Sequence, residues 1–266
     1  MDGRASAAVI ARKEPDAEFR PIQWGMKPPE PVVGRHVYIV DVAFTIEDMR
    51  RIARSASELT WLDHHATCAP MAAELGFGTF DNQECGATLA WKHCFPNDEP
   101  PAVLPYIRDK DLWLWELPDS RQVSAALAER YVDDDFTGLL DIPLDRLKDE
   151  GHAALKRLHT RVNTIIRQGR EIDEPYGLRG VRGLAINNVE LVSEVGERIY
   201  LSEADGGLGY DIGICFGMRG DGRWVHSLRS TTVDCERIAA ARGGGGHRNA
   251  ASYVADEPIV GSADAW

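Results

Sequence analysis

The sequence predicts an α/β protein of two domains, in which an N-terminal domain with a parallel sheet is joined by a long helix and a linker to a smaller α/β C-terminal domain. Two short β-prone runs that each end at an aspartate predict the first sheet. Apolar residues at helical spacing from Leu147 to Ile166 predict the long helix. The chain has 266 residues, 44% of them hydrophobic, which is enough for two cores. The expected bounds are 1–172 and 173–256, followed by a tail over 257–266.

The two strands of the first domain are Val37–Val40, which ends at Asp41, and Leu59–Leu62, which ends at Asp63. Both runs are continuously apolar, as is typical of strands buried on both faces of a parallel sheet. Ligands of open α/β sheets bind at the carboxyl ends of the strands. The two aspartates are therefore expected to face one crevice.

Helices are predicted around these strands. Thr45-Ile46-Glu47-Asp48 has the pattern of a capping box and opens a helix through about Ala56. The other predicted helices of this domain are Ala5–Arg12, Gly86–Cys94, Val103–Arg108 and Val123–Arg130.

The second domain is expected to follow a Gly-rich linker over Pro175–Gly183. Its strands, a hairpin turn and a helix are predicted from β-prone runs, from the turn signal Arg-Gly-Asp-Gly and from helical spacing. The strands are Leu184–Val189, Asp211–Met218, Arg223–Arg229 and Ala250–Val254, the turn is Arg219–Gly222 and the helix is Val233–Ala241.

The net charge of −12, from 42 acidic and 30 basic residues, argues against a long nucleic acid as partner, because the overall field repels phosphate. A short phosphorylated ligand can still bind where metals, arginines and backbone N–H groups reverse the field locally. Five cysteines without a C-x-x-C pair indicate free thiols in a reducing compartment. Neither a signal peptide nor a membrane span is found, so a cytoplasmic protein without a membrane partner is expected.

Asp63-His64-His65 is the first candidate for chemistry. Carboxylate oxygen and imidazole nitrogen together suit Mn²⁺, Zn²⁺ or iron, although a solvated turn is an equal alternative for this triplet alone. Asp41 favours the metal interpretation, because it follows the neighbouring strand. Asp109 adds a third acid in Arg108-Asp109-Lys110-Asp111, where one of the two aspartates could instead cap a turn.

Gly243–Gly246 is the second candidate, since consecutive glycines let backbone N–H groups converge on an anion. The expected substrate-binding residues are Gly244, Gly245, Gly246, His247 and Arg229, the last as a phosphate fork at a strand end. Trp113 and Trp115 could stack on a base, although packing is the favoured interpretation of both.

These residues, in this order, resemble the DHH phosphoesterase superfamily over nearly the whole chain. Asp63–His65 is similar to its Asp-His-His motif, Val37–Asp41 to its second motif and Asp109 to its fourth. Gly243–Ala251 resembles the glycine-rich signature of the DHH-associated C-terminal domain. Asp109–Trp113 matches the Asp-x-Asp-Leu-Trp pattern of the oligoribonuclease or cyclic-nucleotide phosphodiesterase branch.

The resemblance implies two ions, usually Mn²⁺, with Mg²⁺ as an alternative. Asp2-Gly3 looks like the tail of the family's first motif, whose histidine and first aspartate would precede Met1. A start located too late, a trimmed chain and the loss of one metal site are competing explanations, and the late start is favoured. The implied metal ligands are Asp2, Asp41, Asp63, His64 and Asp109, and the implied catalytic residues are Asp63, His64 and His65.

The resulting hypothesis is a metal-dependent phosphodiesterase or exoribonuclease-like hydrolase. It would cleave short oligonucleotides or small nucleotides through metal-activated water. The alternative is a nucleotide-binding protein with an incomplete, weakly active or inactive metal site. Long duplex nucleic acid is not an expected partner, and a homodimer is compatible with the sequence.

Overall fold

The computed structural model describes residues 1–22, 25–130 and 136–259. The chain divides into two compact units, Met1–Lys156 and Arg157–Trp266. This division lies inside the long helix α7 (Leu144–Ile166), whereas the sequence places it at residue 172. The reason is that Val162 and Ile165, near the end of α7, belong to a core of the second unit. The predicted tail lies outside the described residues from position 260 onward.

The first unit contains a parallel sheet of three strands in the order β1-β2-β3, as the fold class predicts. The strands are β1 (His36–Val40), β2 (Glu58–Asp63) and β3 (Thr79–Phe80). Val40 pairs with Leu62. The carboxyl ends of β1 and β2 are therefore level, and the residues that follow them meet at one edge.

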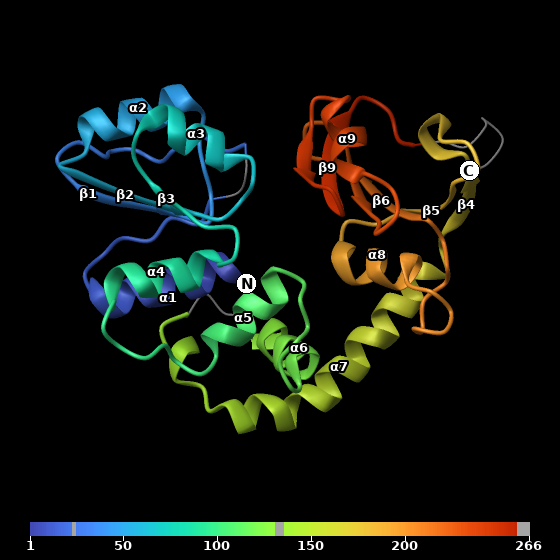
Figure 1. Ribbon diagram of the computed structural model, residues 1–266, viewed down its shortest axis with the longest axis horizontal. Helices are drawn as coiled ribbons and strands as arrows, with labels where there is room; N and C mark the ends of the chain where they lie inside the picture. The colour runs from blue at the N-terminus through green and yellow to red at the C-terminus, as the bar shows by residue number, and fades with distance from the viewer. Residues whose placement is uncertain (23–24, 131–135, 260–266) are drawn as a thin grey trace. The chain divides into compact units, whose positions relative to one another are not determined.

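Helices cover both faces of this sheet (Figure 1). On one face, α2 (Ile46–Ser55) and α3 (Cys68–Leu75) build a core with Met49, Ile52 and Trp61. On the other, α1 (Asp2–Lys13) and α4 (Gly86–Cys94) build a second core. This double cover explains the continuous apolar runs of the strands. The unit is completed by α5 (Leu104–Asp111), α6 (Ser120–Arg130) and the 3-10 turn η1 (Leu139–Asp141).

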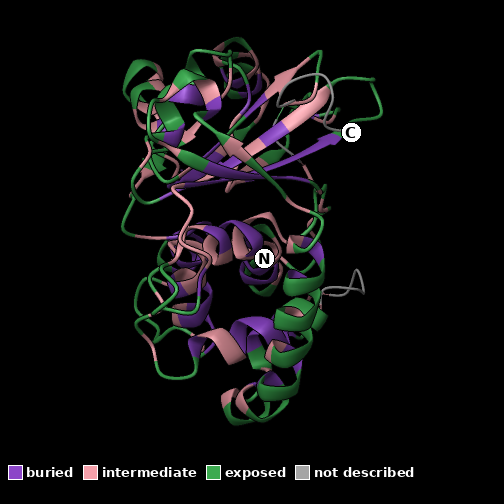
Figure 2. Cartoon of the chain, turned by 90° about the vertical axis from the view of Figure 1, so that its right-hand side faces the viewer, coloured by how far each residue is buried: buried purple, intermediate pink, exposed green. Residues whose placement is uncertain are grey.

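The second unit has a mixed sheet of six strands in the order β4-β5-β6-β7-β9-β8. Helix α8 (Val192–Tyr200) and helix α9 (Cys235–Ala240) contribute to two separate cores, each shared with the sheet. Buried residues gather in the strands and on the inner faces of the helices (Figure 2). The strands are β4 (Arg170–Asp173), β5 (Arg182–Asn187), β6 (Ile212–Met218), β7 (Trp224–Arg229), β8 (Gly245–His247) and β9 (Ala250–Ala255).

The predicted linker over Pro175–Gly183 is wrong. β4 precedes it and pairs antiparallel with β5, so the segment is a connection within the second unit. It contains the short 3-10 turn η2 (Pro175–Gly177), and the side chain of Tyr176 packs against the core. Gly177 and Gly180 have φ of 75° and 74°, so these glycines serve turns that need left-handed backbone and do not mark a flexible hinge.

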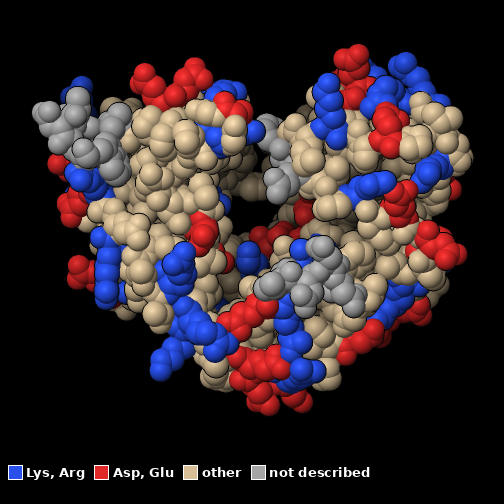
Figure 3. Space-filling model, turned by 180° about the vertical axis from the view of Figure 1, so that it is seen from behind, with Lys and Arg blue, Asp and Glu red and all other residues tan. Residues whose placement is uncertain are grey.

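Charged side chains of both signs are interspersed on the face of the molecule shown in Figure 3. No helix of the described residues is long and apolar enough to cross a membrane.

His226, on β7, makes the second unit sensitive to acid. It is 1% exposed and stacks on Tyr253 at 4.6 Å between ring centroids. Within the described chain, neither ring nitrogen has a partner at hydrogen-bonding geometry. Burial lowers the pKa of His226, the nearby backbone of Trp224 opposes this, and the charge of Arg242 adds to the lowering. The unfolded state therefore binds a proton near pH 6.5 that the folded state rejects.

We expect the free energy of unfolding to fall as pH drops below about 6.5, with a smaller fall in His226→Phe, which keeps the stacked ring without a proton site. At pH 7 the variant should match or exceed the wild type, by up to about 1–3 kcal/mol, because two unsatisfied nitrogens are removed. Urea unfolding of both proteins at pH 5 and pH 7 measures this. Equal losses between the two pH values would contradict the role given to His226.

Candidate metal centre

The ends of β1 and β2 bring Asp41 and His64 into contact. His64 Nε2 lies 3.2 Å from Asp41 Oδ1. Asp41 has a φ of 60°, and its backbone N–H donates to Leu62 O at 3.1 Å. Aspartate tolerates this left-handed conformation better than most residues, because its short polar side chain can bond locally. The two strand ends therefore meet through His64, whereas Asp63, the second aspartate expected at this place, contacts His65.

Asp2, on α1, reaches the same place from the other side of the sheet. Its carboxylate accepts hydrogen bonds from Gly86 N at 2.6 Å and Ala87 N at 2.8 Å, which are unpaired N–H groups at the start of α4. Asp2 Oδ2 is 3.9 Å from His64 Nε2. Burial and the charge of Asp41 raise the pKa of Asp2 to about 6, although the backbone donors oppose them.

Asp111, not Asp109, is the third carboxylate beside His64. Asp111 Oδ2 lies 3.4 Å from His64 Nε2. Asp109 is 2% exposed and accepts hydrogen bonds from Glu116 N at 2.9 Å and from the Ser120 hydroxyl. Asp109, which the sequence predicts as a ligand, instead caps a turn, and Asp111 is the aspartate of this segment that lies beside His64. Both lie on α5, where residues two positions apart point about 200° away from each other.

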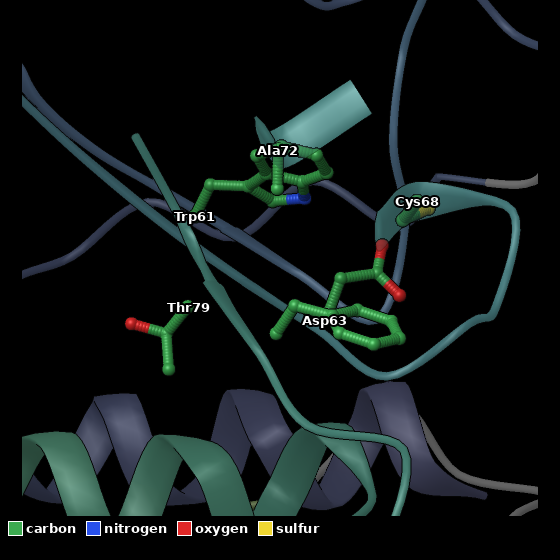
Figure 4. Close-up of a pocket in the computed structure, with 6 residues that line it drawn as sticks. Trp61, Asp63, Cys68, Ala72 and Thr79 are labelled. Carbon is green, nitrogen blue, oxygen red and sulfur yellow. The ribbon is translucent and has the colours of Figure 1, made fainter. Parts of the chain in front are cut away.

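Asp63 and His65 form a supporting pair beside these ligands. Asp63 Oδ1 accepts from the backbone N–H groups of His64 and His65 at 2.7 and 3.0 Å, and it lies 2.8 Å from His65 Nδ1. Its carboxylate points toward Cys68 at the start of α3 (Figure 4). Asp63 therefore lies outside the two ligand groups found in the described chain, and it orients the histidines instead.

Two groups of potential ligands share His64. One contains Asp41, His64 and His65, and the other Asp2, His64 and Asp111, with ligand atoms within 4.8 Å of one another in each. Burial by itself lowers the pKa of His64, but the hydrogen bond with Asp41 and the charges of Asp111, Asp41 and Asp2 raise it to about 9. A positive charge is thus strongly favoured among these carboxylates. Their mixed oxygen and nitrogen donors fit a divalent ion of the Mn²⁺, Zn²⁺ or Fe²⁺ type.

Gly86 is a part of this centre that the sequence did not reveal. A Cβ atom at this position would lie 2.7 Å from Asp41 Cβ, 2.9 Å from Asp2 Oδ2 and 3.0 Å from Ser6 Oγ. The absence of a side chain therefore lets α1, α4 and the end of β1 converge. The Asp-His-His triplet gave a local signal, whereas this contact joins residues far apart in the chain.

Asp109→Asn and Asp111→Asn are expected to have different effects. Asp111→Asn should weaken Mn²⁺ binding by at least about tenfold and leave the melting temperature of the metal-free protein nearly unchanged. Asp109→Asn should lower the free energy of unfolding by about 1–3 kcal/mol, because a buried group that accepts charged hydrogen bonds is altered. Calorimetric Mn²⁺ titration and thermal unfolding distinguish them. Weaker Mn²⁺ binding in Asp109→Asn with unchanged binding in Asp111→Asn would instead indicate that Asp109 is the ligand.

The predicted substrate residues of the second unit have internal partners. Arg229 Nη2 donates to Ser193 Oγ at 3.1 Å, and Gly244 N donates to Ala239 O at 2.9 Å. Gly245–His247 form β8 and pair with β9, so the glycine run is a turn and a strand. Cβ atoms at Gly244 and Gly246 would lie 2.1 Å from Ser252 O and 2.5 Å from Ala250 O. Close backbone packing therefore accounts for these two glycines, and the N–H of Gly244 is not available to an anion.

Comparison with curated proteins gives one relative to report. The chain is 24% identical over 228 residues to an uncharacterised protein, R106, of Acanthamoeba polyphaga mimivirus. The match covers 83% of this chain and 53% of the relative, so the chain spans about half the length of that protein. No family model matches the sequence.

Solved structures that match this chain include a pGpG-specific phosphodiesterase, PggH, from Vibrio cholerae, with 12% identity, a TM-score of 0.49 and coverage of 96% of this chain and 90% of that chain. An exopolyphosphatase-related protein from Bacteroides fragilis has 11% identity, a TM-score of 0.39 and coverage of 85% and 67%. An uncharacterised protein from Helicobacter pylori G27 has 12% identity, a TM-score of 0.30 and coverage of 96% and 84%. Because these TM-scores lie below 0.5, the similarities do not indicate the chemistry of this chain, and only the residues of the site bear on it.

Proposed function

We propose that this chain is a metal-dependent phosphoesterase of the DHH type that hydrolyses short oligonucleotides or small nucleotides. The observation that carries the proposal is the convergence of three carboxylates, Asp2, Asp41 and Asp111, on His64 at the carboxyl edge of the parallel sheet. This edge is where open α/β sheets bind ligands. A site built from several carboxylates with histidine is suited to a divalent cation and, through it, to phosphate.

Asp2, Asp41, His64 and Asp111 would hold the ion. When bound, a divalent ion supplies Lewis acidity, which activates water and neutralises charge on a phosphoryl group. Mn²⁺ is the preferred candidate, because a histidine accompanies the carboxylates. Mg²⁺ favours sites of oxygen ligands.

His65 is suited to a proton-handling role at the phosphate. Its side chain is 40% exposed, and Asp63 Oδ1 lies 2.8 Å from its Nδ1. A carboxylate at this distance holds Nδ1–H and leaves Nε2 to exchange a proton with a substrate oxygen. The hydrogen bond to Asp63 raises the pKa of His65, which favours the protonated ring. Asp63 would act through His65 and would not touch the substrate.

A second candidate function is nucleotide binding without turnover. The observation that favours it is that Asp109 and Asp63, both expected as ligands, lie outside the two ligand groups, with Asp109 and the Oδ1 atom of Asp63 accepting internal hydrogen bonds. Fewer carboxylates then remain for ions than a centre for two metals would use. Such a protein would retain a nucleotide and release no product.

The deciding experiment is a Mn²⁺-dependent hydrolysis assay on the dinucleotides pApA and pGpG, cyclic AMP, cyclic dinucleotides and 3′-phosphoadenosine phosphate. Calorimetry with the same compounds runs in parallel. Product from at least one compound, lost on chelation and restored by Mn²⁺, is expected. Tight binding without product after long incubation would select the binding function, and neither binding nor product would refute both.

A further inference from the structure

The loop that follows Asp111 has a strained backbone. Trp113 and Trp115 both have a φ of 59°, and Asp119 has a φ of 58°. Bulky residues rarely adopt this left-handed conformation, and it persists only where surrounding contacts enforce it. Asp109 makes two of the contacts that hold this loop. Its backbone O accepts a hydrogen bond from Leu114 N at 2.8 Å, and its carboxylate accepts one from Glu116 N at 2.9 Å.

The strained backbone presents two indole rings that belong to no core. Among the described tryptophans, Trp61, Trp91 and Trp224 each lie in or against a hydrophobic core, whereas Trp113 and Trp115 contribute to none of the four. Both rings are half-buried and contact each other edge to face, with centroids 5.0 Å apart. The packing that the sequence favours is thus local: the rings pack on each other, and Arg121 lies over one face of Trp115, with Cζ 4.3 Å from the ring centroid.

The indole pair follows a ligand of the metal centre closely in the chain. Trp113 is two residues from Asp111, whose carboxylate contacts His64. Lys110, the residue before Asp111, places its ammonium 5.1 Å from the centroid of the Trp113 ring. The backbone around Asp111 therefore carries an aromatic ring and a cation next to a carboxylate of the metal centre.

We propose that Trp113 and Trp115 form a stacking surface for the base of a nucleotide, and that they select phosphoesters with a base over phosphoesters without one. Aromatic side chains bind bases through their faces, which every base offers, so such a surface recognises nucleotides in general. Lys110 lies where it can attract the phosphate that joins the base to the metal centre. The inference rests on the proposed function for the position of that phosphate.

The test compares the affinity for AMP with the affinity for ribose 5-phosphate, which lacks the base. Calorimetry in Mn²⁺ uses the wild type, Trp113→Ala, Trp113→Gly and Trp113→Phe. Glycine accepts a positive φ and removes the ring, so it separates loss of the ring from collapse of the loop. Leu114→Ala is the matched control, because this residue lies between the two tryptophans in the chain, is 40% exposed and has no planar side chain.

The wild type should prefer AMP over ribose 5-phosphate by at least about tenfold, within the range that base–aromatic stacking gives. The preference should disappear in Trp113→Ala and Trp113→Gly, largely persist in Trp113→Phe and be unchanged in Leu114→Ala. No preference in the wild type, or the same preference in Trp113→Gly, would overturn the inference. A ring-dependent preference in a protein that hydrolyses nothing would refute the proposed function and leave the stacking surface standing.

Discussion

Replacing His64 with Ala is expected to abolish the proposed Mn²⁺-dependent hydrolysis and to weaken Mn²⁺ binding by more than about 100-fold, because the loss of a residue that only supports a metal ligand already costs up to about that much. The expectation follows from the position of His64, which belongs to both ligand groups. Its removal leaves Asp2, Asp41 and Asp111 without the cationic partner that compensates them. Hydrolysis rates and Mn²⁺ calorimetry measure the effect. His159→Ala, at an exposed position on α7, is the control.

Proton release gives an independent measurement on the same variant. In the metal-free protein the pKa of His64 is raised to about 9, so the ring is charged at pH 7 and must lose its proton to bind an ion. Its charge stabilises the fold fully below about pH 6.5, and this contribution is lost as pH rises through 9. Calorimetry at pH 7 in buffers of different ionisation enthalpy should show about one proton released by the wild type on Mn²⁺ binding. The same release from His64→Ala would show that another group carries the proton.

Gly86→Ala is expected to have the second-largest effect, a loss of Mn²⁺ affinity of at least about tenfold and destabilisation by about 1–3 kcal/mol, as for overpacking a dense interior. The added methyl group would lie 2.7 Å from Asp41 Cβ and 2.9 Å from Asp2 Oδ2, so one carboxylate or the start of α4 must move. Because Asp2 also accepts from Gly86 N, displacement breaks a hydrogen bond at the helix start.

Gly138→Ala is the matched control for this substitution, because a Cβ atom there meets nothing within 4 Å. Thermal unfolding without metal and Mn²⁺ calorimetry are carried out on both variants. If Gly86→Ala bound Mn²⁺ as tightly as Gly138→Ala, the close approach of α4 to the centre would have no role in metal binding.

The sequence predicted the parts of the site that follow from local pattern. Val37–Val40 and Leu59–Leu62 are apolar because helices cover both faces of their sheet, and parallel pairing then places Asp41 beside His64. The helix start predicted at Thr45 also holds, since Thr45 Oγ1 accepts from Asp48 N at 3.2 Å; in place of the second bond of a capping box, the Thr45 hydroxyl donates to the Asp48 carboxylate at 2.9 Å. In each case the signal lies within one element or between adjacent strands.

The predictions that were wrong or missing depend on the direction in which a side chain points and on contacts between residues far apart in the chain. Spacing alone does not tell which of Asp109 and Asp111 faces the strands, because that depends on how α5 packs. β4 escaped notice since Arg170–Asp173 carries three charged side chains, and pairing with β5 makes it a strand. Helix α8 was missed because Gly196 interrupts its pattern. That glycine is needed where a Cβ atom would lie 2.4 Å from Arg229 Cβ.

The left-handed backbone of Asp41 restricts how this centre could be altered by mutation. With a φ of 60°, position 41 accepts Asp, Asn, His or Gly more readily than other residues, whereas Glu or Cys would each oppose the conformation by about 1–2 kcal/mol. Selection for a softer metal, which would favour thiolate, therefore meets resistance from the main chain at this residue. Asp111, at negative φ, is a position where the metal preference can change more easily.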